Sequence, residues 1–559
     1  MEKRWTKRNS LSTLESVVLK NYGHKTIDEL LNPKKDPYLC HLKKCVCRLR
    51  KAKDETVVII ADYDCDGVVS GGVLERGLKE YGVKSVHVRY PKRLSEGYGI
   101  SMNIVDEIAE KYGKCLIITV DNGIAAREVI DHAKAKGMEV IVTDHHLPRD
   151  DKKLPKVEII LDPKATDRSE FKEYCGAGLA WRIVKELIPE KQEVLKDLLV
   201  LVSIATVADV VPLVGDNRNI VKEGLELINA RHTTKGMLAL LGQIGQEHID
   251  ETSYGFSIAP IINAAGRLYD DGPQMVHDLI FATEADPDLP KKAKELIEHN
   301  EKRKEMEKEF MKIAGEQLEN VEIENCIVLY HKDFHEGLVG IIAGRLAESY
   351  GVPAIVFTDA SAPGKLKGSG RTASGIHLKA SLDAVNEHIF RYGGHAGAAG
   401  LTIEKDNLDT FRDALNRYLE GKVTEETKST LPYDLEIEVE DIPTMENELE
   451  RFAPFGEGNP RPIFRIRNFQ TEILGGSFYR TMGKEGEHVK LMNKTACALG
   501  FGMANRFEQD GCPRKIEILG TLSKNVFNGY KNDQIEIMDY KAEKENFELQ
   551  DILKDLLSF

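Results

Sequence analysis

The stretch VVIIADYDCDGVVSGG, residues 57–72, decides the fold that the sequence predicts for this chain of 559 residues. It begins with four consecutive β-branched residues, Val57–Ile60, which are typical of a buried strand in a parallel sheet. Three carboxylates follow at alternate positions: Asp62, Asp64 and Asp66. A turn of small residues then leads into a predicted helix over 68–81. The carboxyl ends of parallel strands line the edge where open α/β sheets bind their ligands.

The three carboxylates indicate a bound cation. At neutral pH, carboxylates this close together repel one another strongly unless a positive charge neutralises them. Hard divalent cations prefer clusters of oxygen ligands. We therefore interpret this stretch as part of a metal site whose remaining ligands come from elsewhere in the chain. The alternative is an acidic surface loop.

The pattern of a strand that ends in ionisable residues recurs along the chain. A second strand is predicted over 85–90, and further strands lie within 115–123, 139–148 and 159–163. The side chains at the ends of the last three strands are Asp121, the run Asp144-His145-His146, and Asp162. Strands that alternate with helices and carry such residues at one edge predict a doubly wound parallel sheet, with its site along that edge.

Two other positions are candidates for the same site. The loop PKRLSEGYG, residues 91–99, offers Arg93, whose planar guanidinium suits a phosphate, and Tyr98, which could stack on a base; a solvated turn is the alternative. Asp209 is the only charged residue in the apolar stretch 198–214. Burying a lone carboxylate is costly unless it is paired or binds a metal. Asp209 is therefore a candidate ligand, with a helix cap or a buried ion pair as the alternative.

Composition predicts a soluble cytoplasmic protein of three or four domains. Hydrophobic residues make up 42% and charged residues 30% of the chain, as in ordinary globular proteins. No secretory signal follows the basic N-terminus, and no apolar run reaches the roughly 20 residues of a membrane span. Cys40, Cys45 and Cys47 lie near His41 and could form a metal corner, but we favour reduced thiols on an N-terminal helix.

The net charge argues weakly against a nucleic-acid partner. Lys and Arg total 77 and Asp and Glu total 91, which gives a net charge of −14. Net charge averages over the whole surface, however, and bound divalent cations would invert the local field. An acidic chain can therefore still bind phosphates in a groove of opposite sign.

A helical connector and a second α/β domain are predicted after Arg218. Within the connector, Arg267 of IINAAGRL could neutralise a phosphate near the metals. The charged helical stretch 286–321 is predicted to be a solvent-exposed strut between domains. Beyond it, residues 364–376 and 391–400 are predicted as glycine-rich loops whose backbone approaches phosphates, and they carry Lys365, Lys367, Arg371 and His395.

From residue 426 onward, short alternating runs separated by turn residues predict a small all-β barrel. Basic residues, such as Arg465 and Arg467, are interspersed with aromatic residues along these runs. This mixture suits single-stranded nucleic acid, because aromatic rings stack on bases while cations follow the backbone. A barrel that serves only as a structural lid is the alternative.

The ordered set of motifs resembles the DHH phosphoesterase superfamily, and more closely its RecJ family of single-strand-specific 5′→3′ DNA exonucleases. The motifs are DYDCDG, VDNG, TDHH and VADVVPL in the first domain, GSGR and GGHAGAAG in the second, and FAPFGEGNPRPIF before the barrel. The resemblance covers roughly residues 50 to 540. It implies a DHH domain, a DHHA1 domain and an OB-fold barrel. The predicted domains are an N-terminal region 1–50, the DHH domain 51–225, the helical connector 226–320, the DHHA1 domain 321–425, the OB-fold domain 426–545 and a C-terminal helix 546–559.

The resemblance also implies roles for individual residues. Two Mn²⁺ or Mg²⁺ ions would be shared by Asp62, Asp64, Asp66, Asp121, His145 and Asp209. Asp121 would bridge the two ions, and His146 would lie beside the scissile phosphate. The 5′ end would be held by Arg93, Ser369 and Arg371, with Tyr98 as a stacking candidate. The phosphates near the cut would be held by Asn263, Arg267 and His395.

These expectations define a metal-dependent exonuclease that releases 5′-mononucleotides from single-stranded DNA, in DNA repair and recombination. Two ions about 3.5–4 Å apart would activate a water nucleophile and stabilise the charge that develops in an in-line displacement. The alternatives are a phosphodiesterase of short RNA, cyclic dinucleotides or pyrophosphate, and a binding protein of the same fold. The resemblance suggests helicase and single-strand-binding protein partners, and we expect a monomer.

Overall fold

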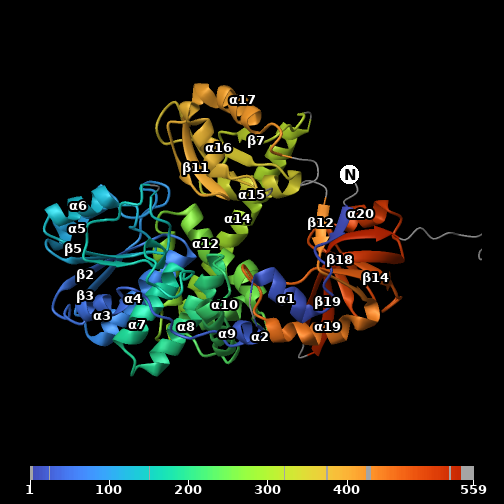
Figure 1. Ribbon diagram of the computed structural model, residues 1–559, viewed down its shortest axis with the longest axis horizontal. Coiled ribbons are helices and arrows are strands. Elements are labelled where there is room, and N and C mark those ends of the chain that lie inside the picture. The colour runs from blue at the N-terminus through green and yellow to red at the C-terminus, as the bar shows by residue number, and fades with distance from the viewer. Residues whose placement is uncertain are drawn as a thin grey trace, which may run out of the picture. The chain divides into compact units, whose positions relative to one another are not determined.

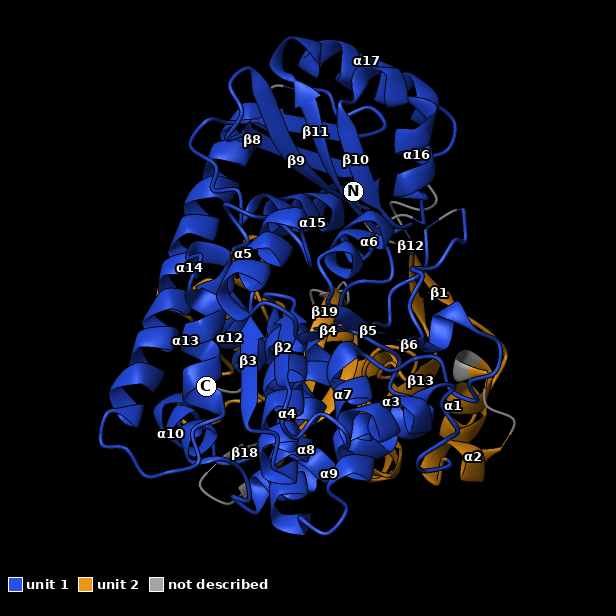
Figure 2. Cartoon of the chain, turned by 90° about the vertical axis from the view of Figure 1, so that its left-hand side faces the viewer, with its two compact units in different colours: residues 1–2, 34–430 blue, residues 3–33, 431–559 orange. Residues whose placement is uncertain are grey.

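The computed structural model describes residues 4–23, 26–149, 151–319, 321–372, 375–423, 430–527 and 530–542. The predicted C-terminal helix lies outside the described residues. The chain forms two compact units, which Figure 2 colours separately: the first contains residues 34–430, and the second contains the described parts of 3–33 and 431–559. None of the described helices combines the length and the apolar character that crossing a membrane requires.

The first unit contains the predicted parallel sheet. Its first strand in the chain, β2 (Thr56–Ala61), leads after three residues into α4 (Cys65–Tyr81), as the opening stretch indicated. The other strands are β3 (Ser85–Arg89), β4 (Leu116–Val120), β5 (Glu139–Thr143) and β6 (Ile159–Leu161). The strands lie in the order β3-β2-β4-β5-β6, and every neighbouring pair is parallel.

Helices cover both faces of this sheet because both faces of its strands are apolar. Val57 and Ile59 of β2 belong to a core cluster that also contains residues of α3 (Leu42–Leu49), α4 and α7 (Gly176–Leu187). Val58 and Ile60 belong to the opposite cluster, with α5 (Met102–Tyr112) and α6 (Arg127–Ala135). Figure 1 shows these two helix layers with the sheet between them. The doubly wound parallel fold is confirmed.

The strand order identifies the position of a site. From β2 the chain passes to β3 on one side and then crosses to β4 on the other side of β2. Ligands in open α/β sheets bind at this switch point, outside the carboxyl ends of the strands. Asp62 follows β2 directly, and Asp121 follows β4 directly.

The connector is helical, as predicted. Helices α8 (Gln192–Ala208) and α9 (Gly215–Asn229) lie before it or reach its first residues. The predicted connector, 226–320, then contains α10 (Lys235–Ile244), α11 (Glu251–Ser253), a π-helical turn (Tyr254–Ile258), α12 (Ala259–Leu268), α13 (Gly272–Ile280) and α14 (Leu289–Leu318). The prediction of a solvent-exposed strut was wrong in part. Leu296 of α14 is buried in the core of the DHH-side helices, and Phe310 is buried in the core beside α15. The charged helix therefore joins two cores through an apolar face.

The second α/β domain of the first unit has one mixed sheet, in the order β10-β11-β9-β8-β7. Its elements are β7 (Ile327–Tyr330), α15 (Val339–Tyr350), β8 (Ala354–Asp359), β9 (Lys365–Arg371), α16 (Leu378–Ala384), β10 (Arg391–Gly394), β11 (Ala398–Glu404) and α17 (Leu408–Leu419).

The two glycine-rich stretches of this domain are strands, so predicting them as loops was wrong. Lys365–Arg371 forms β9, and the second stretch forms the hairpin of β10 and β11. At Gly368 a Cβ atom would lie 2.4 Å from the Phe357 ring, and at Gly370 it would lie 2.9 Å from Leu378. These glycines therefore make room for core side chains rather than for a phosphate.

The second unit is a mixed seven-stranded sheet in the order β13-β14-β18-β19-β17-β16-β15. The strands are β13 (Leu435–Glu438), β14 (Phe464–Gln470), β15 (Tyr479–Met482), β16 (His488–Leu491), β17 (Cys497–Gly500), β18 (Lys515–Phe527) and β19 (Tyr530–Ala542). The helices are α19 (Ile442–Leu449) and α20 (Ala504–Gln509). The predicted strands are present, among them β13 and β14, which pair in parallel.

The N-terminal residues pack into this second unit. They form β1 (Arg4–Lys7), which pairs with β12 (Thr430–Tyr433), followed by α1 (Leu14–Tyr22) and α2 (Ile27–Leu31). Leu14, Val17 and Leu30 are buried in the same core cluster as Phe464. The segment before Lys34 therefore stabilises the C-terminal unit, through long-range pairing that no local pattern of the sequence indicated.

Candidate metal centre

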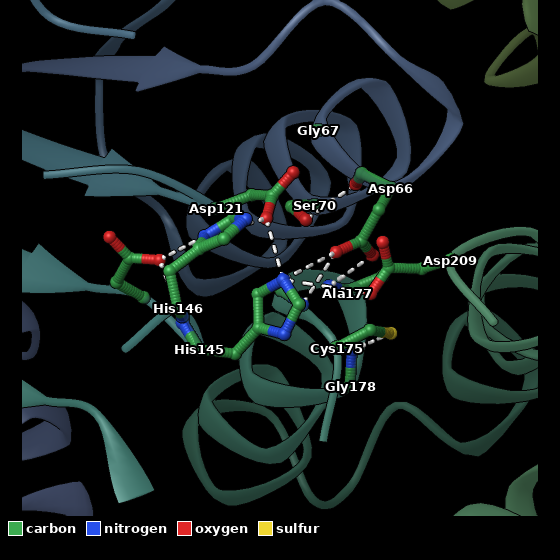
Figure 3. Close-up of polar contacts among 12 residues, drawn as sticks. Asp66, Gly67, Ser70, Asp121, His145, His146, Cys175, Ala177, Gly178 and Asp209 are labelled. Carbon is green, nitrogen blue, oxygen red and sulfur yellow. Dashed lines mark hydrogen bonds and ion pairs between the residues drawn. The ribbon is translucent and has the colours of Figure 1, made fainter. Parts of the chain in front are cut away.

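The side chains that follow the parallel strands meet at the switch point of the sheet. His145, which follows β5, directs its Nε2 atom toward three carboxylates (Figure 3). Its distances are 3.0 Å to Oδ1 of Asp121, 3.6 Å to Oδ2 of Asp209 and 3.8 Å to Oδ2 of Asp66. Four elements thus each place one possible metal-ligand side chain around Nε2 of His145 or supply that atom itself. They are strands β4 and β5, helix α4 and the end of α8.

Three overlapping groups of side chains have the spacing of metal ligands. In each group, one ligand atom per residue lies within 4.8 Å of the others. The groups are Asp66-His145-Asp209, Asp62-Asp64-Asp121 and Asp121-His145-His146. Together they contain every residue that was predicted as a metal ligand. Asp121 and His145 each belong to two groups.

Several ligand atoms of this cluster are buried and have no hydrogen-bond partner among the described residues. These atoms are Oδ1 of Asp62, Oδ1 of Asp121, and both ring nitrogens of His145. Buried polar atoms are hydrogen-bonded in the great majority of cases, so such a concentration calls for an explanation. Carboxylate oxygens suit Mg²⁺ and Mn²⁺, and a neutral imidazole is a common ligand of transition metals. The donor set therefore fits a divalent metal centre.

The electrostatics of the cluster support the same interpretation. Burial, and then the neighbouring carboxylates, raise the pKa of Asp62, Asp121 and Asp209 well above the usual value. The same causes raise the pKa of Asp66 to about 6. Burial lowers the pKa of His145 to about 3, which keeps its imidazole neutral at pH 7. A cation would offset both the burial and the repulsion that raise these carboxyl pKa values.

The backbone around the cluster is held in unusual conformations. Asp121 has φ of 61° and Val210, directly after Asp209, has φ of 56°. Positive φ is uncommon for aspartate and rarer still for a β-branched residue, and such strain concentrates at functional sites. Asn122 stabilises the turn after β4 by donating hydrogen bonds to the carbonyl groups of Ile60 and Val120.

Gly176 and Ala177 support Asp66, a role that the sequence did not reveal. Their backbone N–H groups, at the start of α7, donate to Oδ2 and Oδ1 of Asp66 at 2.6 and 2.8 Å. A Cβ atom at Gly176 would lie 2.6 Å from Cβ of Asp121 and 3.0 Å from Oδ2 of Asp66. Glycine is thus required there by close packing, and the run Cys175-Gly176-Ala177-Gly178 before a helix was its only sequence signal.

His146 lies beside the cluster, half-exposed, and is oriented by Asp144. Its Nδ1 atom is 2.8 Å from Oδ1 of Asp144 and 3.9 Å from Oδ1 of Asp121. Burial lowers the pKa of His146, but the hydrogen bond to Asp144 and the nearby carboxylates outweigh burial and raise it to about 9. Asp144 also accepts backbone hydrogen bonds, including one from Ile124. His146 is therefore positively charged at pH 7, in contrast to His145.

The loop 91–99 borders the cluster. The Tyr98 hydroxyl donates to the backbone carbonyl of Asp121 at 3.0 Å, so Tyr98 faces the site. The Arg93 guanidinium lies 4.6 Å from the centre of the Tyr63 ring. Asp270, which follows α12, holds the loop by accepting hydrogen bonds from Leu94 N–H and the Ser95 hydroxyl.

Three arginines from different parts of the first unit influence one another. Burial lowers the pKa of Arg267 to about 9, with a further decrease from Arg93. Burial and the charge of Arg93 also lower the pKa of Arg371. Arg371 donates to the Ser369 hydroxyl at 2.9 Å, and Arg267 donates to the Gly337 carbonyl. Within the described part of the chain, none of the three has a carboxylate ion-pair partner.

The remaining predicted residues have defined positions. Asn263 accepts a hydrogen bond from Cys65 N–H at 2.9 Å, next to two candidate ligands. His395 lies in the β10–β11 turn, where burial and the charges of Arg371 and His146 lower its pKa. In the second unit, Arg465 and Arg467 form ion pairs with glutamates, so they are less available to a phosphate than their sequence pattern indicated. Among the described residues, Cys40, Cys45 and Cys47 belong to no group with metal-ligand spacing.

Comparisons with known proteins agree with this architecture. Three family models match: the DHH family N-terminal domain over residues 56–206, the DHHA1 domain over 324–421 and the RecJ OB domain over 433–539. The chain is similar to the single-stranded-DNA-specific exonuclease RecJ of Dickeya dadantii, with 31% identity over 88% of both chains. It is similar to the Bacillus subtilis protein of the same name, with 33% identity over 90% of this chain and 64% of that one.

A solved structure extends the likeness to three dimensions. RecJ from Thermus thermophilus in complex with Mn²⁺ superimposes with a TM-score of 0.79 and 26% identity, over 97% of this chain and 80% of that one. The fold, the order of the domains and the sequence identity all agree with membership of one family. The chain belongs to the RecJ family of the DHH superfamily.

Proposed function

We propose that this chain is a two-metal-ion exonuclease that hydrolyses single-stranded DNA in the 5′→3′ direction to 5′-mononucleotides. The observation that carries the proposal is the cluster of buried donor atoms without hydrogen-bond partners, which adjoins three arginines without carboxylate partners in the described structure. The names of the relatives, single-stranded-DNA-specific exonucleases, support the substrate. The Mn²⁺ complex of the Thermus thermophilus relative supports the metal.

The proposed ligands of two Mn²⁺ or Mg²⁺ ions are Asp62, Asp64, Asp66, Asp121, His145 and Asp209. Asp121 belongs to two of the ligand groups, which supports a bridging role. Divalent cations bound in such a site activate water as a nucleophile and stabilise the charge that develops on the phosphate. The N–H groups at the start of α7 hold Asp66 in a single orientation, which prepares the site before the ions bind.

The proposed phosphate ligands are Arg93, Asn263, Arg267, Ser369, Arg371 and His395. A partly buried arginine without an anionic partner is costly, and a phosphate that accepts hydrogen bonds from several guanidinium groups would remove that cost. Ser369 holds the Arg371 side chain by a hydrogen bond and thereby orients its remaining N–H groups. Tyr98, whose hydroxyl binds beside Asp121, is proposed to contact the nucleotide at the cut.

His146 is proposed to act on the scissile phosphate. Its pKa of about 9 means that it carries a proton at neutral pH. Because Asp144 occupies the Nδ1 side of the ring at 2.8 Å, the Nε2 side remains available to donate to a phosphate or leaving-group oxygen. Asp144 fixes the orientation of the ring in the same way that second partners orient catalytic histidines.

Several finer assignments accompany the proposal. We propose that the chain acts as a cytoplasmic monomer in DNA repair and recombination, with a helicase and a single-strand-binding protein as partners. The domain boundaries predicted from the sequence are retained as proposals. The match to the RecJ OB domain favours an extended single strand over a short RNA or a cyclic dinucleotide, because a small substrate needs no third domain.

The decisive experiment supplies the Mn²⁺-loaded protein with 5′-labelled single-stranded DNA, duplex DNA, short RNA and a cyclic dinucleotide. We expect labelled mononucleotides to appear first, and only from the single strand. Asp121→Ala should abolish this activity. Asp167→Ala is the matched control, because this exposed carboxylate pairs only with Lys172 in the described structure. Faster hydrolysis of the cyclic dinucleotide or RNA than of single-stranded DNA would contradict the proposal.

A further inference from the structure

Phe256 is the most exposed large apolar side chain in the described part of the chain. It is 82% exposed and lies in the π-helical turn Tyr254–Ile258, directly before α12. Turns of this kind interrupt α-helices frequently at functional sites. A single exposed phenylalanine needs no explanation in itself, so its position relative to the candidate centre decides its meaning.

Phe256 continues the accessible face of α12. From Ile258 to Leu268, only Pro260, Asn263 and Arg267 are not buried, at spacings of three and four residues. Such spacings lie on one side of a helix, and Phe256 precedes Pro260 by four further residues. At the rise of an α-helix, Phe256 lies about 10 Å from Asn263 along this face. The same face therefore presents an arginine, an amide and an aromatic ring in succession.

The turn that carries Phe256 also packs close to a candidate metal ligand. A Cβ atom at Gly255 would lie 3.8 Å from Cγ1 of Val207, so the turn contacts the last turn of α8. Asp209 caps α8 two residues later. Val210, which follows, is itself 65% exposed. Phe256 thus belongs to the surroundings of the centre on the side of Asp209.

The order of residues along α12 gives a direction. Arg267 lies at one end of this face, where burial and the charges of Arg93 and Arg371 lower its pKa. Asn263, in the middle, accepts a hydrogen bond from Cys65 N–H beside the candidate ligands. Phe256 lies at the opposite end. If Arg93 and Arg371 hold the 5′ end, as the family resemblance implies, then a strand that follows this face past the metals reaches Phe256 on the 3′ side of the cut.

We propose that Phe256 forms a base-stacking subsite for the single strand, within the first few nucleotides 3′ of the scissile phosphate. This inference rests on the proposed function and adds a contact to a base on the 3′ side of the cut, whereas Tyr98 is proposed to contact the nucleotide at the cut. Stacking on an aromatic ring tolerates every base, so it would hold the strand without reading its sequence.

The test combines a protein variant with a DNA variant. Single-stranded oligonucleotides carry one abasic residue at each of the first six positions 3′ of the first scissile bond, and KM and kcat are measured for the first cleavage. For the native enzyme, one position should raise KM by about tenfold with little change in kcat, as expected for the loss of one stacked base. Phe256→Ala should raise KM for intact DNA by a similar factor.

The combination of the two changes distinguishes stacking from other effects. The abasic residue at the sensitive position should not raise KM further in Phe256→Ala, and Phe256→Trp should restore the native profile. Tyr350→Ala is the matched control, because Tyr350 is 40% exposed at the end of α15, and it should behave as native. An active Phe256→Ala enzyme with the native KM and the native abasic profile would overturn this inference alone. Failure of the native enzyme to cleave single strands would overturn the proposed function with it.

Discussion

Nε2 of His145 lies 3.0 Å from Oδ1 of Asp121, yet neither atom has a hydrogen-bond partner among the described residues. Burial keeps the imidazole neutral, with a pKa of about 3, and its Nδ1 atom has no partner either. These two buried atoms can both donate an electron pair, and they are not hydrogen-bonded to each other. They are therefore positioned to bind a third atom between them. A divalent cation accounts for both.

Metal binding should therefore release protons and strengthen as pH rises. Because the pKa of Asp66 is about 6 without a metal, and those of Asp62 and Asp121 are higher than usual, these carboxyls hold protons that the ions must displace. Calorimetric titration with Mn²⁺ in buffers of different ionisation enthalpy should show net proton release at pH 6 and a higher affinity at pH 8. Equal affinity at the two pH values would contradict this account.

Asp162 should make the metal-free protein less stable as pH rises. Burial and the charge of Asp144 raise its pKa to about 7, so the folded state binds more protons than the unfolded state between about pH 4 and pH 7. Asp162→Asn should raise the melting temperature at pH 8 and leave it unchanged near pH 4. We expect a gain of about 1–3 kcal/mol in the free energy of unfolding at pH 8. A gain of equal size at both pH values would show that ionisation of Asp162 is not the cause.

Gly176→Ala should abolish activity without unfolding the protein. The added methyl group would lie 2.6 Å from Cβ of Asp121, so the carboxylate that is proposed to bridge the ions has to move. Loss of more than about 100-fold in kcat is expected, because a displacement of about 1 Å in a catalytic site has that effect. Gly242→Ala is the control, since a Cβ atom at this position in α10 meets nothing within 4 Å. It should keep full activity and gain about 0.5–1 kcal/mol of stability.

Arg371→Ala should weaken binding of single-stranded DNA and reduce its dependence on salt. Loss of one phosphate contact lowers the slope of log affinity against log salt by about 0.7 for single strands. Fluorescence anisotropy of the metal-free protein measures both quantities. Arg412→Ala, in the same domain, serves as a control because Arg412 already pairs with Asp409. Mn²⁺ occupancy should remain at the native value, and a decrease would mean that Arg371 acts on the metal centre instead.

The parallel sheet and the cluster at its edge were predictable from short stretches of sequence. Runs such as Val57–Ile60 indicate buried strands without further information, and the carboxyl ends of parallel strands meet wherever the helices lie. The candidate residues Asp121 and His145 could thus be paired before the structure was known. Asp209 could be singled out because a lone charge in an apolar helix needs a partner.

Features that depend on distant contacts were not predictable in the same way. Gly368 and Gly370 resemble a phosphate-binding loop, but their small size serves Phe357 and Leu378, which come from other parts of the chain. The role of Gly176 likewise follows from its distance to Asp121, which no local pattern reports. The packing of Leu14 into the C-terminal core joins residues more than four hundred positions apart, such as Phe464.

Manganese stoichiometry, followed by electron paramagnetic resonance, tests the central claim most directly. The native chain should bind two Mn²⁺ ions whose spectrum shows magnetic coupling, because Asp121, which belongs to two of the three ligand groups, is proposed to bridge the ions. Asp121→Asn should bind at most one ion and show no coupling, while Asp167→Asn should match the native chain. Two coupled ions in Asp121→Asn, or no more than one ion in the native chain, would contradict the account.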